Sequence, residues 1–275
     1  MQKRRYLQVL LILLFAIGLM GLLWTSALHI ALPVDQTRER PIIGDLGGVP
    51  VEVPRAYARF VEYDGDPHFM ERKENVPVKR TYKSRLRSFG FDVRFSDMAV
   101  KERNYSGGSR PLPHRWINVG VKSGDRYDLD GKELNRLRDR VLQKNKPCHD
   151  KCFFYIEMPQ KKYGLTGYEP IGSGVEVGAR NIDYGRGADL RDRNIYYYEN
   201  PEGRVVTYIR CSNRSHGRAT CTQHFDLCPR MRVRVTVLYH RDEFLEKWKE
   251  IQRKVSRLIY GFSVRENEVK EGYHG

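Results

Sequence analysis

The sequence lacks the short motifs that mark the common enzyme classes. It contains no G-x-S-x-G nucleophile elbow, no H-E-x-x-H zinc pair, no P-loop and no G-x-G-x-x-G turn. Gly172-Ser173-Gly174 is one residue too short for the elbow and lies in a glycine-rich stretch. The 8 histidines are scattered along the chain and do not form a ligand or triad pattern. We therefore expect no catalytic residues, no metal and no cofactor.

Acidic residues are in short supply as well. The chain has 34 Asp and Glu against 49 Lys and Arg, a formal net charge of +15. This excess is spread along the sequence, and none of the familiar nucleic-acid-binding patterns accompanies it. The charge is compatible with an ordinary soluble surface, and it also favours an acidic partner. Among acidic partners we expect a protein with an acidic surface and exclude nucleic acid.

Long apolar segments are confined to the N-terminus. From Leu7 to Leu28 no charged residue occurs, and Lys3, Arg4 and Arg5 precede the run. About 20 apolar residues span a bilayer, and basic residues on one flank keep that flank in the cytoplasm. The sequence predicts a cytoplasmic tail at 1–5, a transmembrane anchor at 6–29, a linker at 30–43 and an outer domain at 44–275. A cleaved signal peptide ending near Thr25-Ser26-Ala27 and a buried core helix are the alternatives.

Cysteine is sparse, with 5 residues that all follow the predicted anchor. They are Cys148, Cys152, Cys211, Cys221 and Cys228. Outside the cytoplasm disulfides persist, so two bridges and one spare thiol are expected. Cys211 and Cys221 flank a polar stretch typical of a hairpin loop, which makes them a favourable pair. Cys148 and Cys152 bond to each other in one alternative, and one of them reaches Cys228 in another. A zinc site of Cys148, His149, Cys152 and His224 is a further alternative.

The periodicity of apolar residues predicts an α+β fold, with helices packed on a mainly antiparallel sheet. Three consecutive strands are expected at 205–211, 221–227 and 230–239, followed by a helix that Asp242 caps and that runs to Tyr260. The helix carries a single apolar stripe from Phe244 to Ile259 with Trp248 inside it. Further strands are expected at 89–95, 117–121, 153–156, 175–177 and 194–198, and a helix at 132–143. Pro50 restricts the alternating segment around it to a sheet edge or to extended chain.

Tyrosine and arginine suggest a binding face. In the last predicted strand Met231, Val233, Val235, Val237 and Tyr239 alternate with Arg230, Arg232 and Arg234. If the apolar set faces the core, the three arginines face outward and favour an acidic partner. Tyr196 and Tyr198 lie in a neighbouring strand, and tyrosine is a residue type favoured at protein interfaces. The sequence thus predicts a binding face formed by Arg230, Arg232, Arg234, Tyr196 and Tyr198, although core and ordinary surface positions remain the alternative.

Two segments and the anchor resemble a group of bacterial proteins. The segments are GGVPVEVPRAYARFVEYDGDPHF, at 47–69, and RVRVTVLYHRDEFLEKWKEIQRKVSRLIYGF, at 232–262. Together with the anchor they look like small membrane-anchored proteins of Gram-negative bacteria that accompany type VI secretion effectors as immunity proteins. The resemblance implies a single-pass inner-membrane protein whose domain faces the periplasm and whose partner is a secreted toxin. It carries over no functional residue. An envelope assembly factor and an undetected envelope hydrolase are the alternative functions.

Overall fold

The computed structural model describes residues 40–67, 79–100, 115–127, 130–142, 155–170, 193–212 and 219–264. All of them belong to one compact unit, Arg40–Gly275. The predicted anchor, the strand expected at 175–177 and the pair Cys148 and Cys152 lie outside these ranges. Within them, no helix combines the length and the apolar character needed to cross a bilayer.

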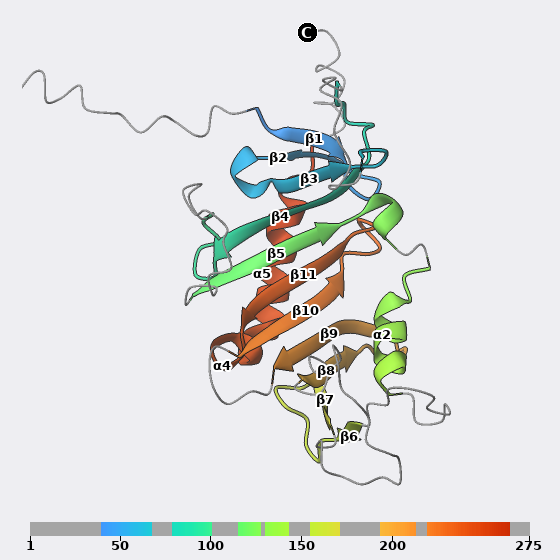
Figure 1. The fold of residues 1–275 in the computed structure, drawn as a ribbon, viewed down its shortest axis with the longest axis vertical. Coiled ribbons are helices and arrows are strands. Elements are labelled where there is room, and N and C mark those ends of the chain that lie inside the picture. Colours follow the sequence, from blue (N-terminus) through green and yellow to red (C-terminus); the bar gives the residue numbers. More distant parts are fainter. Residues whose placement is uncertain are drawn as a thin grey trace, which may run out of the picture. The chain divides into compact units, whose positions relative to one another are not determined.

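A nine-stranded antiparallel sheet forms the centre of the unit, in the order β3-β4-β5-β11-β10-β9-β8-β7-β6 (Figure 1). Its strands are β3 (Arg59–Tyr63), β4 (Leu86–Arg94), β5 (Trp116–Lys122), β6 (Tyr155–Glu157), β7 (Thr166–Pro170), β8 (Arg193–Glu199), β9 (Val205–Ser212), β10 (Thr220–Asp226) and β11 (Arg234–His240). Two successive meanders, β3–β5 and β6–β11, meet where β5 pairs with β11. The predicted antiparallel α+β architecture is therefore confirmed for the described residues.

Alternating apolar residues give the sheet one fully buried face. Phe91 of β4, Val119 of β5 and Val237 of β11 are buried on this face, and the residues between them point to the other side. β-Branched and aromatic side chains suit such a half-buried pleated surface. The predicted inward set of the last strand is confirmed, because Met231, Val233, Val235, Val237 and Tyr239 are all buried.

The C-terminal helical segment packs on this buried face and lies behind the sheet in Figure 1. It consists of α4 (Arg241–Phe244), the 3-10 turn η4 (Leu245–Lys247) and α5 (Trp248–Tyr260). The apolar stripe is confirmed, since Trp248, Ile251, Val255 and Ile259 are buried. The prediction of one continuous helix capped by Asp242 is wrong. The residue before α4 is His240, no side chain caps the helix, and Asp242 lies in its first turn.

The predicted edge segment around Pro50 forms a separate two-stranded sheet. Its strands are β1 (Ile42–Asp45) and β2 (Pro50–Val53), and Pro50 pairs with Asp45 at the end of the ladder. Gly47 and Gly48 connect them with φ of +62° and +93°, a conformation that glycine adopts without a steric penalty. The 3-10 turns η2 (Arg55–Tyr57) and η3 (Gly124–Arg126) complete the N-terminal half.

A second, smaller core lies on the opposite face of the sheet. Helix α2 (Glu133–Val141) places Leu134 against Tyr168, Ile195, Tyr197 and Tyr208 of strands β7, β8 and β9. Figure 1 shows α2 beside β9 at one end of these strands. The sheet therefore has helices on both faces, α5 on one and α2 on the other.

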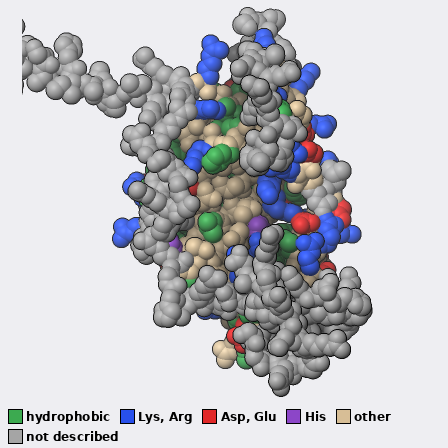
Figure 2. Space-filling view, in the orientation of Figure 1, with side chains coloured by type: hydrophobic (Ala, Val, Ile, Leu, Met, Phe, Trp, Pro, Cys, Tyr) green, Lys and Arg blue, Asp and Glu red, His purple; other side chains and the backbone are tan. Residues whose placement is uncertain are grey.

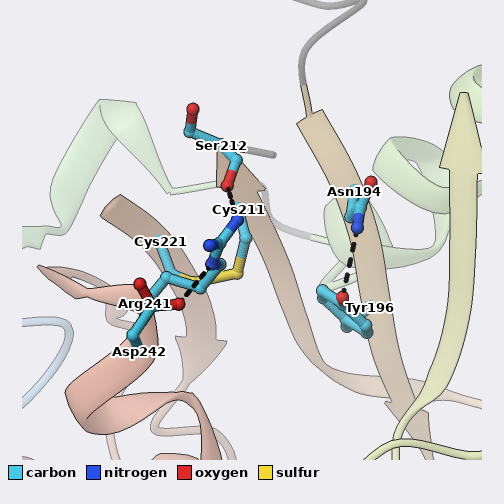
Figure 3. Close-up of a disulfide and its surroundings, with 7 residues drawn as sticks. All are labelled: Asn194, Tyr196, Cys211, Ser212, Cys221, Arg241 and Asp242. Carbon is cyan, nitrogen blue, oxygen red and sulfur yellow. Dashed lines mark hydrogen bonds and ion pairs between the residues drawn. A yellow bond between two sulfur atoms is a disulfide. The ribbon is translucent and has the colours of Figure 1, made fainter. Parts of the chain in front are cut away.

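The predicted disulfide is confirmed. Cys211 of β9 and Cys221 of β10 are direct cross-strand partners, buried, with a Cα–Cα distance of 4.0 Å. Close by, Arg241 of α4 donates to the Ser212 carbonyl at 2.8 Å and to Asp242 at 2.7 Å (Figure 3). The disulfide links the end of β9 to the start of β10, and Arg241 links the end of β9 to the start of α4.

Candidate functional site

The side of the sheet opposite α5, called the open face below, carries polar residues in cross-strand rows. The pairing places Gly90, Gly120, Thr236 and His224 side by side across strands β4, β5, β11 and β10. Two of these four residues are glycines, so the side chains of this row project little above the sheet. Figure 2 views this face and shows a central area of backbone and uncharged polar atoms. No described helix packs over this part of the sheet.

Two carboxylates on the open face are paired with arginines. Asp92 of β4 accepts hydrogen bonds from Arg59 at 2.5 Å and from Asn118 at 2.7 Å. Arg126 and Glu62 lie 2.8 Å apart. Arg210 and Lys122 add positive charge near His224 on the same face.

His224 is the one residue of the central row with a side chain able to transfer protons. Its Nδ1 lies 3.1 Å from the Thr236 hydroxyl. Burial lowers the pKa of His224 most, the positive charges of Arg210, Arg234 and Lys122 lower it as well, and together they bring this pKa to about 3. At neutral pH the ring is therefore uncharged and a weak base, because catalytic bases work best with a pKa near the operating pH.

The three predicted arginines do not form one ladder. Strand β11 begins at Arg234 and not at Arg230. In the turn before it, the Leu227 N–H donates to the Val233 carbonyl, and the Arg232 N–H donates to the Gly47 carbonyl. Arg230 stacks on the Tyr260 ring at 4.6 Å. Arg234 makes two hydrogen bonds with Asp226, at 2.9 and 3.2 Å, and its side chain is only 11% exposed. The expectation that Arg234 points freely to solvent is wrong.

The two predicted tyrosines lie on the other side of the sheet. Tyr196 pairs with Ile209 and is 2% exposed, so it belongs to the core. Tyr198 pairs with Thr207, whose hydroxyl hydrogen bonds to Gln252 of α5, and it is 37% exposed beside Trp248. The prediction that these tyrosines and Arg234 share one face of the sheet is therefore wrong. Whether any of these residues binds a partner stays a prediction.

Of the remaining cysteines, Cys228 is a free, exposed thiol. Cys148, Cys152 and His149 lie outside the described residues, so the predicted connectivity of that pair stays a prediction. Across the described ranges, no three His, Cys, Asp or Glu side chains come together in a way that would hold a metal ion.

One hollow of about 450 Å³ lies beside the hairpin that follows β4. Both of its carboxylates accept hydrogen bonds: Asp97 from Arg94 Nε at 3.0 Å, and Glu243 from the backbone N–H of Arg115 at 3.4 Å. The hydrogen bond from Arg94 and the backbone hydrogen bond from Ala99 hold the pKa of Asp97 well below its ordinary value. Both carboxylates of the hollow are therefore engaged in hydrogen bonds within the protein.

Sequence reasoning named Tyr198 but missed the exposed Tyr163 and the lysines that join these tyrosines in an aromatic and basic patch at the β6–β7 end of the sheet. Tyr163 is 46% exposed at the turn between these strands, and Tyr198 of β8 lies next to the same end. Lys162 Nζ is 5.8 Å from the centre of the Tyr163 ring, and Lys249 Nζ is 5.4 Å from that of Tyr198. The available signal was Lys161-Lys162-Tyr163-Gly164, a basic turn between two strands.

Comparison with known proteins identifies one informative relative in structure. No protein-family model matches the chain, and no curated protein does. The solved structure of Smlt3025, described as an immunity protein of the Stenotrophomonas maltophilia type IV secretion system, matches with a TM-score of 0.51. The chain shares its fold with a secretion-system immunity protein. The match covers 82% of this chain and 94% of Smlt3025 at 16% sequence identity. The TM-score and the coverage show a common fold, and an identity of 16% does not carry a function over to this chain.

Proposed function

We propose that this protein is an immunity protein that neutralises a secreted toxin by binding it, without catalysing a reaction. The observation that carries the proposal is the similarity to Smlt3025, which spans 94% of that immunity protein and most of this chain. The resemblance of segments 47–69 and 232–262 to membrane-anchored immunity proteins points in the same direction from the sequence.

The described surfaces support binding over catalysis. The central histidine of the open face is an uncharged weak base, and the two carboxylates of the hollow next to β4 accept hydrogen bonds within the protein. A net charge of +15 suits a partner with an acidic surface. A protein that acts by stoichiometric binding needs such a surface and needs no reacting group.

We place the protein in the inner membrane, with residues 6–29 as its anchor and the sheet domain in the periplasm. The uncharged run from Leu7 to Leu28 behind Lys3–Arg5 motivates this topology. The Cys211–Cys221 bridge suits the same location, because disulfides persist in oxidising compartments.

The toxin in this proposal is delivered by a type VI apparatus, as the sequence resemblance suggests. Smlt3025, the structural relative, serves a type IV system. Competition against attacker strains that lack either the type VI or the type IV apparatus distinguishes the two delivery routes. Protection that matters only against attackers with an intact type VI apparatus supports the type VI assignment, and protection only against type IV attackers replaces it.

The decisive experiment tests the products of the genes that flank the gene of this protein as candidate toxins. Each product is directed to the periplasm of a sensitive host, with and without the full-length protein. We expect growth arrest without the protein, rescue with it, and a one-to-one complex of the two purified partners. Failure of rescue together with absence of a complex contradicts the proposal. Turnover of a lipid or glycan by the purified protein alone contradicts it too.

A further inference from the structure

The β6–β7 hairpin ends in a tight turn with an unusual residue at its first position. Lys162 and Leu165 exchange backbone hydrogen bonds of 3.0 and 2.9 Å, so Tyr163 and Gly164 are the two central residues. Their φ angles are +53° and +79°, the pattern of a type I′ turn, where Asn, Asp and Gly are the usual choices. A tyrosine there is strained, because its Cβ crowds the backbone at positive φ. The ring is therefore held in place at an energetic cost.

The backbone of this turn is hydrogen bonded to the first residue of α5. The indole Nε1–H of Trp248 donates to the Tyr163 carbonyl at 3.0 Å, and Trp248 itself is buried. The hairpin lies at the β6 end of the sheet, the lower end in Figure 1. Because a buried side chain fixes the backbone of the turn, the position from which the exposed Tyr163 side chain projects is fixed as well. Preorganisation of this kind lowers the entropic cost of binding.

The tip of the hairpin carries charge of one sign. Residues 159–164 are all exposed and include Lys161 and Lys162 without an acidic residue among them. The ammonium groups of Lys162 and Lys249 lie over the rings of Tyr163 and Tyr198. An exposed aromatic surrounded by such cations combines apolar contact area with electrostatic attraction to carboxylates.

We infer that the hairpin tip, with Tyr163 at its centre and Lys161, Lys162 and Lys249 around it, is the surface that binds the toxin, on a carboxylate-rich part of that protein. This inference rests on the proposed function and adds the site and the chemistry of its partner. Tyr163 supplies the buried anchor of the complex, and the lysines steer the encounter.

Phe60 is the competing surface and provides a matched control. It is 82% exposed, has a φ of +52° and lies on β3, the opposite edge strand of the sheet. Its neighbour Arg59 already pairs with Asp92. Phe60 therefore has the exposure and the strain of Tyr163 but a neighbouring cation that is engaged within the protein.

The test compares Tyr163→Asn and Lys161→Glu/Lys162→Glu with the controls Phe60→Asn and Lys83→Glu, where Lys83 is an exposed lysine that precedes β4. The full-length protein is titrated with the purified flanking-gene product against which it protects, in a non-toxic variant. Tyr163→Asn relieves the positive φ, so it should melt at or above the wild-type temperature while affinity falls at least about tenfold. The charge reversal should lower the association rate and flatten its salt dependence. Both controls should bind like wild type.

The outcomes separate this inference from the proposed function. Wild-type protein that binds and protects, together with tip variants that bind equally well, overturns the inference and leaves the function intact. Loss of binding in Phe60→Asn alone also overturns it. If Tyr163→Asn melts early, Tyr163→Gly gives the same comparison with a residue that accepts positive φ. Wild-type protein that neither binds nor protects overturns both proposals.

Discussion

The indole Nε1–H of Trp248 donates a hydrogen bond to the backbone carbonyl of Tyr163, 85 residues earlier in the chain, at 3.0 Å. Trp248 is also buried in the main core at the start of α5 and lies 5.6 Å from the Tyr198 ring. The Trp248 side chain therefore packs in the main core and also hydrogen bonds to the β6–β7 hairpin. The first prediction follows from this double role.

Replacement of Trp248 by alanine should destabilise the domain strongly. Deleting a buried aromatic costs about 3–5 kcal/mol, a large share of the about 5–15 kcal/mol that stabilises a domain. Lys249→Ala, at the exposed neighbouring position, is the control and should change the free energy of unfolding little. Denaturant titration of both variants measures the difference, and equal midpoints would contradict the packing of α5.

Loss of the Cys211–Cys221 bridge should lower stability by about 3 kcal/mol on the chain-entropy model. The double variant Cys211→Ala/Cys221→Ala is compared with Cys228→Ser, which removes the exposed free thiol and should be silent. A reductant should destabilise wild type and leave the double variant unchanged. Non-reducing peptide mapping that recovers both cysteines as free thiols from periplasmic material would rule the bridge out.

The Arg234–Asp226 pair should contribute more to stability than the Arg241–Asp242 pair. The Arg234 and Asp226 side chains are 11% and 6% exposed, whereas Asp242 is 77% exposed. Removing one partner of a buried pair costs about 3–5 kcal/mol, and an exposed pair is worth about 0–1 kcal/mol. Asp226→Ala should therefore unfold at clearly lower denaturant concentration than Asp242→Ala. Similar midpoints would show that Arg234 is not dependent on Asp226.

His224 should make the domain sensitive to mild acid. Its pKa is lowered to about 3 in the folded state, from an ordinary value of 6.5, by burial and by three nearby cations. Between these two values the unfolded chain binds a proton that the folded chain does not. Stability should fall as the pH drops from about 6.5 toward 3, by at most about 1.4 kcal/mol per pH unit from this group. His224→Gln should reduce the slope measured by denaturation at several pH values, and an unchanged slope would assign it to other groups.

The N-terminus should cross the membrane once, with its first residues in the cytoplasm. Lys3–Arg5 and the uncharged run behind them are the basis for this expectation. A reporter that is active only in the periplasm, fused after Gly275, should be active. Activity of a cytoplasm-only reporter at the same position would reverse the topology.

Local patterns in the sequence predicted much of the sheet, because side-chain alternation is a local property of a strand. Phe89, Phe91 and Val93 share one face as expected, and so do Val235, Val237 and Tyr239. The Cys211–Cys221 bridge was accessible for the same reason, since the two cysteines flank a short loop. The break between α4 and α5 was not predicted, because the apolar spacing continues through the 3-10 turn η4.

The candidate binding residues required information from distant parts of the chain. Arg234 looks like an outward-facing residue until the cross-strand register places Asp226 opposite it. Tyr196 and Tyr198 share one face of their strand, yet Tyr196 is buried and Tyr198 lies beside α5. Tyr163 stands out because Trp248 donates a hydrogen bond to its carbonyl, and no local sequence pattern predicts this long-range contact.

The order of the strands has a consequence for how this protein is made. The first meander ends at β5, and its partner in the sheet is β11, almost half the chain later, as in the pairing of Val119 with Val237. A chain synthesised from its N-terminus exposes the free edge of β5 until the C-terminal meander has been made. Pairing over such a sequence separation is slow, and unpaired strand edges invite association with other chains. Truncation before β11 therefore removes the strand that joins the two meanders, and the edge of β5 stays exposed.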